Sequence, residues 1–530
     1  MLKLPHGLSF PDLYARDGLL RLDAAFLAAL ATADEALCGQ LRAAREQADV
    51  LTNKQESELL IALAPHLDDF IAHLFGIEPE VHVLSARHHE LAPLFSCKRL
   101  FVQRKALHKY KADAALAIDG PKLRVQLTGL FGGQFSELVF AQQVARWQTE
   151  EATHETELDL ALQYAAWATQ APAGKAAHGS GVLFKVPHKL NYQHLVPLGA
   201  DDAGGYTAFV AEPAHIRRRA GFKLTDRGTD LTGALDQANY CIWCHEQGKD
   251  SCSKGLKEKN ATGRGVASFK KSPFGVTLAG CPLEEKISEF HKVKTEGLAI
   301  GALAVIAVDN PMAAATGHRI CNDCMKACIY QKQEPVDIPQ AETRTLKDVL
   351  ELPWGFEIYS LLTRWNPLNL RTPYPMAPTG KRVLIAGMGP AGFSLAHYLM
   401  NDGHTVVGID GLKIEPLPPH ISGVDSRGTR VAFEPIRDVN ALYEALDERV
   451  MAGFGGVAEY GITVRWDKNF LKVIRLLIER RAEFALFGGV RFGGTITADE
   501  AFAQGFDHIA LALGAGRPTV LDMPNGLARG

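Results

Sequence analysis

The sequence predicts a multidomain protein. An α-helical, cysteine-bearing segment is followed by an α/β Rossmann-like dinucleotide-binding domain and preceded by an α+β N-terminal region. Three observations carry this prediction. The chain has 530 residues, which is too many for a single hydrophobic core. Seven of its nine cysteines lie between positions 241 and 328. A glycine fingerprint for dinucleotide binding begins at Gly387.

Composition and charge are those of an ordinary soluble globular protein. Hydrophobic residues make up 47% of the chain and charged residues 22%. A formal net charge of −3 gives no reason to expect nucleic acid or an anionic membrane as a partner. The longest apolar run, 298–308, has eleven residues and is too short to span a bilayer, and the start of the chain carries no apolar signal core. We therefore expect a cytoplasmic protein, in whose reducing compartment clustered thiols are metal ligands and not disulfides.

Residues 1–230 are expected to be helical at first and mixed afterwards. Apolar residues recur at spacings of three and four over 19–30, which predicts an amphipathic helix. Alternating apolar residues at 123–127 favour a strand, and helical patterns follow at 135–149 and 156–169. We find no chemical motif in this region.

The cysteines of the next segment, 231–363, are spaced as metal ligands. They are Cys241-x2-Cys244-x7-Cys252, then Cys281, then Cys321-x2-Cys324-x3-Cys328. A two-residue gap lets two thiolates reach one metal centre from a tight turn. If 321–328 is helical, its three sulfurs project from one face. Four thiolates complete one iron–sulfur cubane or one tetrahedral zinc site, so seven cannot complete two sites without a non-cysteine ligand. The lone Cys38 and Cys97 have no spaced partner and are expected to be core or surface residues.

A proline-rich linker, 364–380, leads to the final domain, 381–530. That domain opens with a strand at 381–386, a glycine turn, a helical stretch at 393–400 and a second strand at 405–409. An acidic residue, Asp410, ends the second strand. This order of elements is the signature of a dinucleotide-binding βαβ unit.

Each residue of the glycine turn has a physical role. Gly387 permits the tight turn, Gly389 lets the backbone approach a pyrophosphate, and Gly392 lets the helix pack on the sheet. Pro390 and Ala391 lie between them, where the helix N-terminus favours phosphate. Asp410 is expected to accept hydrogen bonds from ribose hydroxyls and to disfavour a 2′-phosphate, which leaves FAD and NAD as alternatives. A second glycine group at 453–456 has no apolar strand before it and is expected to be a loop.

The order of cysteine-rich segment, proline linker and Val-Leu-Ile-Ala-Gly-x-Gly-Pro-Ala-Gly resembles the small (β) subunit of bacterial glutamate synthase. It is equally similar to the N-terminal half of dihydropyrimidine dehydrogenase. The resemblance covers roughly residues 235–520. It also includes Cys281-Pro282, Asn310-Pro311 and Ile338-Pro339-Gln340-Ala341-Glu342. One departure is large, because about twenty-five additional residues separate Cys252 from Cys281.

The resemblance implies an α-helical iron–sulfur domain followed by an FAD-binding domain. Two [4Fe–4S] clusters would have interleaved ligands. One set would be Cys241, Cys244, Cys252 and Cys328, and the other Cys281, Cys321, Cys324 and Glu342. FAD would occupy the glycine turn, and Gly455, Gly456 and Gly514 would belong to its site.

The function implied is that of an FAD- and [4Fe–4S]-dependent oxidoreductase that passes electrons from NAD(P)H to an acceptor. The family continues past Gly514 into an NAD(P)H domain, so the 381–530 domain is expected to be incomplete at its C-terminus. The expected partners are therefore an NAD(P)H-binding domain or subunit and an electron-acceptor domain or subunit. No catalytic residue is assigned. Two alternatives stay open: a zinc-binding assembly module with an ADP-binding fold, and an NAD-dependent dehydrogenase.

Overall fold

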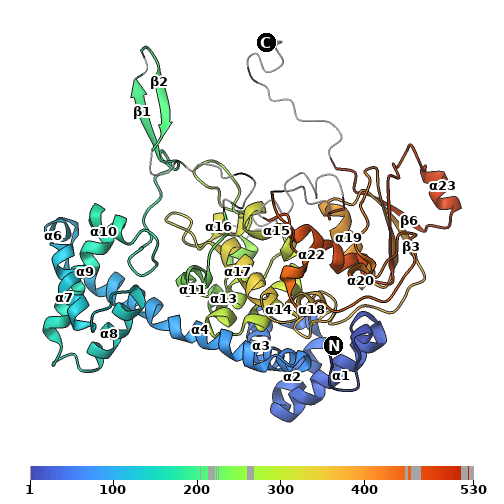
Figure 1. Ribbon diagram of the computed structural model, residues 1–530, viewed down its shortest axis with the longest axis horizontal. Coiled ribbons are helices and arrows are strands. Elements are labelled where there is room, and N and C mark those ends of the chain that lie inside the picture. Colours follow the sequence, from blue (N-terminus) through green and yellow to red (C-terminus); the bar gives the residue numbers. More distant parts are fainter. Residues whose placement is uncertain are drawn as a thin grey trace.

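In the computed structural model the chain is mostly helical, and its described strands form one hairpin and one four-stranded sheet (Figure 1). The structure describes residues 2–202, 204–212, 226–258, 268–447, 452–454 and 467–514, with the single residues 216, 221, 224 and 523. Among these residues, no helix is both long enough and apolar enough to cross a bilayer.

The chain begins with helices, as expected. They are α1 (Arg16–Ala33), α2 (Glu35–Glu46), α3 (Asn53–Phe75) and α4 (Glu78–Ser96). The apolar positions over 19–30 form the buried stripe of α1. Thr52 begins α3 with a capping box, because its hydroxyl accepts the N–H of Gln55 while the Gln55 side chain accepts the N–H of Thr52. Gly76, with a φ of +62°, ends α3.

Residues 97–177 form a second helical group. A π-helix (Cys97–Ala106) extends α4, and the helices that follow are α5 (Leu107–Lys109), α6 (Ala112–Leu116), α7 (Gly120–Leu130), α8 (Glu137–Thr149), α9 (Glu155–Gln170) and α10 (Pro172–Ala177). The helices expected at 135–149 and 156–169 are confirmed as α8 and α9. The strand expected at 123–127 is wrong, because these residues belong to α7. Leu123 and Leu127 are buried one helical turn apart, while Val125 is 74% exposed.

A hairpin and a run of short helices follow. The hairpin pairs β1 (Leu198–Asp202) with β2 (Thr207–Ala211) and projects from the body (Figure 1). The helices of the cysteine-bearing segment are α11 (Leu231–Tyr240), α12 (Ser251–Lys254), α13 (Ile287–Thr295), α14 (Ala299–Asp309), α15 (Ala313–Ile320), α16 (Asp323–Ala327), α17 (Ile338–Leu350) and α18 (Gly355–Leu362). The apolar run 298–308 gives α14, which is buried over nearly all its length.

The α/β part is a parallel sheet with Rossmann connectivity. Its elements are β3 (Arg382–Ala386), α19 (Pro390–Asn401), β4 (Thr405–Asp410), α20 (Pro419–Ser422), α22 (Phe470–Glu479), β5 (Phe484–Gly488), α23 (Ala498–Ala503) and β6 (His508–Leu511). The strand order is β5-β4-β3-β6. Counted in chain order within this sheet alone, these are its third, second, first and fourth strands. The order therefore reverses between β3 and β6, and nucleotides bind at such a switch point.

The buried side chains form two large cores. One contains the 94–184 helices together with Leu235. The other joins the N-terminal helices, the cysteine-bearing segment and one face of the sheet, including Val383 and Ile385. The opposite face packs Leu384 and Ile409 against α23. Cys241, Cys252, Cys324 and Cys328 thus share one core with this face of the sheet. The division of the chain at residues 230, 363 and 380 stays a prediction.

Candidate functional site

Four cysteines from separate segments meet in a first buried group. Cys241 follows α11, Cys244 begins a 3-10 turn, Cys252 lies in α12 and Cys328 follows α16, and all are at most 9% exposed. Cys252 and Cys328 hydrogen-bond to each other, which lowers the pKa of Cys328 to about 7. Burial, followed by the nearby charges of Asp250 and a Cys328 thiolate, raises the pKa of Cys244 to about 11. The group is the first set that the sequence predicts.

Backbone N–H groups surround these sulfurs. The Cys241 sulfur accepts the N–H of Trp243, and the Cys244 sulfur accepts the N–H of Ser251. The Cys328 sulfur accepts the N–H groups of two residues that follow it, Tyr330 and Val336. Trp243 has a φ of +51°, an uncommon conformation for a non-glycine residue, and it lies inside the Cys-x2-Cys turn. Such N–H···S contacts stabilise thiolates and tune the potential of iron–sulfur clusters.

The second predicted set differs in burial from one cysteine to the next. Cys324 is buried in α16, Cys281 is half-buried before α13, and Cys321 is exposed at the end of α15. Burial raises the pKa of the Cys324 thiol, and the charges of Glu342, Glu285, Cys281 and Cys321 raise it further.

Two carboxylates belong to this second group. Oε1 of Glu342 accepts a hydrogen bond of 2.8 Å from the Asn310 side chain. Burial raises the pKa of Glu342 to about 7. Glu285 is 3% exposed, and burial followed by the charge of Glu342 raises its pKa well above the ordinary value. Sequence reasoning missed Glu285 and Asn310. A signal for Asn310 was present, because the resemblance described above includes Asn310-Pro311.

The two groups are neighbours. The backbone N–H of Cys281 donates to the carbonyl of Cys252 at 2.8 Å. Cys324 and Cys328 lie in and just after the same short helix, yet they belong to different groups. Residues 321–328 are not one helix, since α16 spans only Asp323–Ala327, so the condition under which the three sulfurs would share one helical face is not met. α16 ends at Ala327, and Cys328 follows it with a non-helical ψ of 142°.

Within the described residues, no group of three or more His, Cys, Asp or Glu side chains has the arrangement that would hold a single metal ion. A zinc ion needs its donors to converge on one point. A cubane instead offers a separate iron to each thiolate, so its ligands do not converge on one point. Metal binding by either group stays a proposal.

The glycine turn follows β3. Gly387 has a φ of +98°, and a Cβ there would lie 2.3 Å from the carbonyl oxygen of Ala512 beyond β6. A Cβ on Gly392 would lie 1.9 Å from the carbonyl oxygen of Gly387. Both positions therefore require glycine for packing. A Cβ on Gly389 would meet no atom of the described residues within 4 Å, so these residues leave space in front of the helix N-terminus.

The remaining predicted residues frame this opening. Pro390 and Ala391 form the first turn of α19, and Gly389 is its N-cap. Asp410 ends β4, and its two carboxylate oxygens accept the N–H groups of Met388 at 3.1 Å and Leu412 at 2.9 Å. Gly514, with a φ of +68°, follows β6 on the other side of the switch point, and a Cβ there would meet no atom of the described part of the chain within 4 Å. Gly455 and Gly456 lie outside the described residues.

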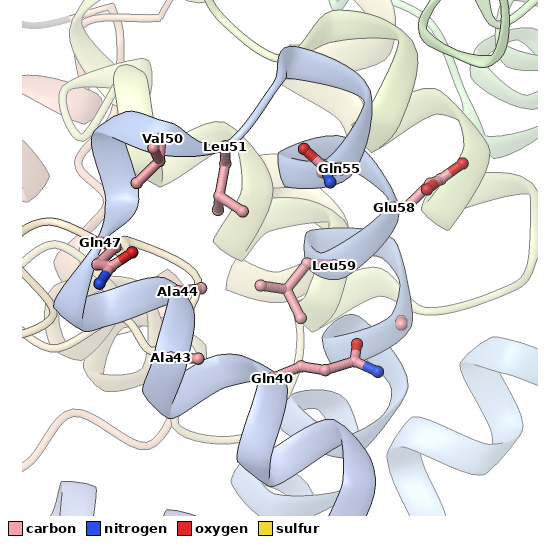
Figure 2. Close-up of a pocket in the computed structure, with 10 residues that line it drawn as sticks. Gln40, Ala43, Ala44, Gln47, Val50, Leu51, Gln55, Glu58 and Leu59 are labelled. Atoms are coloured by element: carbon pink, nitrogen blue, oxygen red, sulfur yellow. The ribbon is translucent and has the colours of Figure 1, made fainter.

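A separate pocket of about 650 Å³ lies between α2 and α3 (Figure 2). Ala43, Ala44, Leu51 and Leu59 line it, with glutamine side chains at its rim. None of the predicted site residues borders this pocket.

Residues 4–76 match the model of the RP005 N-terminal alpha-helical domain. The uncharacterized protein RP005 of Rickettsia prowazekii is 34% identical over 307 residues, which is 56% of this chain and 100% of RP005. The chain belongs to the RP005 family.

Two further relatives of the RP005-family chain share only part of their length with it. The uncharacterized protein RP006 of Rickettsia prowazekii is 52% identical over 219 residues, which is 41% of the chain and 30% of RP006. The NADPH glutamate synthase small chain of Mycobacterium tuberculosis is 27% identical over 204 residues, which is 35% of the chain and 38% of that protein. The similarity to glutamate synthase small chains is therefore distant and partial.

Proposed function

We propose that this RP005-family chain is part of an FAD- and [4Fe–4S]-dependent oxidoreductase that passes electrons from NAD(P)H to an acceptor domain or subunit. The observation that carries the proposal is the burial of Cys241, Cys252, Cys324 and Cys328 in the core that also contains one face of the sheet, with Cys252 hydrogen-bonded to Cys328. The partial similarity to glutamate synthase small chains supports the same class of enzyme.

The donor sets fit iron–sulfur clusters. Cys241, Cys244, Cys252 and Cys328 would hold one cluster, and Cys281, Cys321, Cys324 and Glu342 the other. The N–H donors around the sulfurs offset the charge of buried thiolates, whose formation burial alone opposes. Asn310 orients Glu342, as hydrogen-bond partners orient ligating carboxylates.

The glycine turn fits a dinucleotide such as FAD. The open space at Gly389 would admit a pyrophosphate against the N-terminus of α19, where free N–H groups and the helix dipole favour negative charge. Asp410 would face the ribose and keep the turn in place through Met388. When bound, a flavin accepts a hydride and passes on single electrons, which clusters carry one at a time. This chain's residues bind and orient these groups, and we assign none of them an acid–base role.

The proposal is tested by replacing one cysteine at a time in anaerobically purified protein. Cys328→Ala is expected to remove about half of the bound iron and acid-labile sulfide, because one of two clusters loses a ligand. Cys97→Ala is the matched control, since Cys97 is also buried but lies outside both groups. Equal iron in the two variants, or zinc in place of iron in the unmodified protein, would contradict the proposal.

A further inference from the structure

Residues 253–280, here called the insertion, form a loop between two cysteines, Cys252 and Cys281. The insertion starts after Cys252 and ends before Cys281, whose backbones are hydrogen-bonded. Two glycines, Gly255 and Gly280, lie where the two ends of the insertion come together, and we call this place the neck. A Cβ on Gly280 would lie 2.5 Å from the backbone nitrogen of Gly255, and one on Gly255 would lie 2.6 Å from the carbonyl oxygen of Ala279. The additional residues relative to glutamate synthase small chains are thus looped out without separating the two cysteine groups.

The described part of the insertion is tied together by backbone hydrogen bonds. Leu256 donates to Leu278 at 2.9 Å, Lys270 donates to Leu256 at 2.8 Å, and Leu278 donates to Lys270 at 2.9 Å. Residues 259–267 lie outside the described part of the chain. The side chains on either side of that gap are therefore held at defined positions relative to the neck.

The insertion is strongly basic in a chain of net charge −3. It contains six basic residues and one acidic residue, Glu258. Lys257, Lys270 and Lys271 are exposed, while Lys254 at the neck is paired with Glu284 at 3.3 Å. Ser268 donates to Glu258 at 3.1 Å. The exposed lysines therefore give this surface a positive potential.

Two exposed apolar side chains accompany the lysines. Phe274 is 63% exposed and Val276 is 46% exposed. The ring of Phe274 meets that of Tyr192 edge-on at 5.7 Å, and the Tyr192 hydroxyl donates to the carbonyl of Gln331, three residues after Cys328. The 272–276 turn of the insertion is thereby connected to the segment that follows Cys328. We call Lys257, Lys270, Lys271, Phe274 and Val276 the basic patch.

We propose that the basic patch is the docking surface for a small acidic protein that carries single electrons. This inference rests on the proposed function and names the class of its acceptor. Electron-transfer partners meet through small interfaces whose complementary charge steers the encounter. An exposed aromatic side chain within a charged ring supplies the apolar contact that such interfaces need. Each encounter transfers one electron from this protein to the carrier, and no bond is made or broken.

The position of the basic patch supports a protein carrier over a polyanion. Its neck joins Cys252 of one group to Cys281 of the other, so a protein docked there lies beside both groups. Nucleic acid binding is driven by phosphate neutralisation over an extended basic surface, whereas this chain is acidic overall. The apolar pair Phe274 and Val276 has no role in phosphate binding.

The test measures binding of oxidised flavodoxin, an acidic one-electron carrier, to the full chain by calorimetry at low and high salt. The variant Lys257→Glu/Lys270→Glu/Lys271→Glu is expected to weaken binding by about tenfold or more, and high salt to weaken binding to the unmodified chain. Lys111→Glu/Lys122→Glu/Lys175→Glu makes the same charge change on exposed lysines of the 97–177 helices and is expected to leave binding unchanged. Phe274→Ala is expected to weaken binding without changing its salt dependence.

The outcomes separate the two proposals. Iron, sulfide and visible absorbance are recorded for each variant, so a chain without clusters is recognised independently of binding. Clusters present with no flavodoxin binding, or binding equally weakened by both triple variants, would overturn the docking proposal. So would patch-dependent binding of transfer RNA or of anionic vesicles in place of flavodoxin. Basic cytochrome c is the protein control and is expected not to bind.

Discussion

Glu357 and Arg480 form a buried ion pair between the cysteine-bearing helices and the α/β part of the chain. Nη1 of Arg480 lies 2.9 Å from Oε1 of Glu357, and both side chains are at most 1% exposed. Arg480 also donates to the hydroxyl of Tyr14 at 3.0 Å, and Glu357 accepts the N–H of Ile436 at 2.7 Å. Because Tyr14 precedes α1, one polar network ties three distant parts of the sequence together.

Removing Glu357 should therefore destabilise the whole protein. Glu357→Ala leaves Arg480 buried without its charge partner, which costs about 3–5 kcal/mol of unfolding free energy. Urea denaturation measures the change. Glu58→Ala, which breaks the exposed pair with Lys54, is the control and should cost at most about 1 kcal/mol. Similar losses for the two variants would show that the buried network does not join the parts.

The three glycines of the turn should respond differently to alanine. Gly392→Ala places a Cβ against the Gly387 carbonyl and should lower stability, because the helix must move off the sheet. Gly389→Ala meets nothing within 4 Å, so the thermal midpoint should stay unchanged. Flavin affinity of Gly389→Ala should nevertheless fall about tenfold or more, because the new methyl group occupies the proposed pyrophosphate space. Unchanged affinity would remove the turn from the nucleotide site.

Asp68 should make stability depend on pH. Its Oδ1 accepts the N–H of Gly301 at the start of the buried helix α14, and burial raises the pKa of this carboxyl to about 7. The folded state therefore holds the proton more tightly than the unfolded state. This stabilisation is complete below pH 3.8, declines as pH rises and is lost once pH passes about 7.

Asp68→Asn keeps the acceptor and removes the charge, so the variant should gain stability over the unmodified protein as pH rises from 4 to 8. The gain at pH 8 should be about 2–4 kcal/mol in unfolding free energy. The exposed neighbour provides the control, and Asp69→Asn should show no such trend. A difference between Asp68→Asn and the unmodified protein that does not change with pH would contradict this account.

The sequence predicts local features well where one short-range rule applies. The strands at 382–386 and 405–410 and the turn between them follow from periodicity and glycine spacing. The alternation at 123–127 predicted a strand, but the spacing of Leu123 and Leu127 is equally compatible with a helix. Both side chains pack into the core of the 94–184 helices, and the segment is part of α7. The meeting of Cys252 with Cys328 is a tertiary contact that spacing alone does not reveal. Glu285 was overlooked because only the folded chain brings it to Cys324.

The most direct measurement is the iron, acid-labile sulfide, zinc and flavin content of the anaerobically purified chain. Two [4Fe–4S] clusters would give equal amounts of iron and sulfide, about eight of each per chain, and we expect little zinc. Flavin should bind when it is supplied and should depend on Gly389. A properly folded sample that carries one zinc per chain, with neither iron nor sulfide, would contradict the central claim.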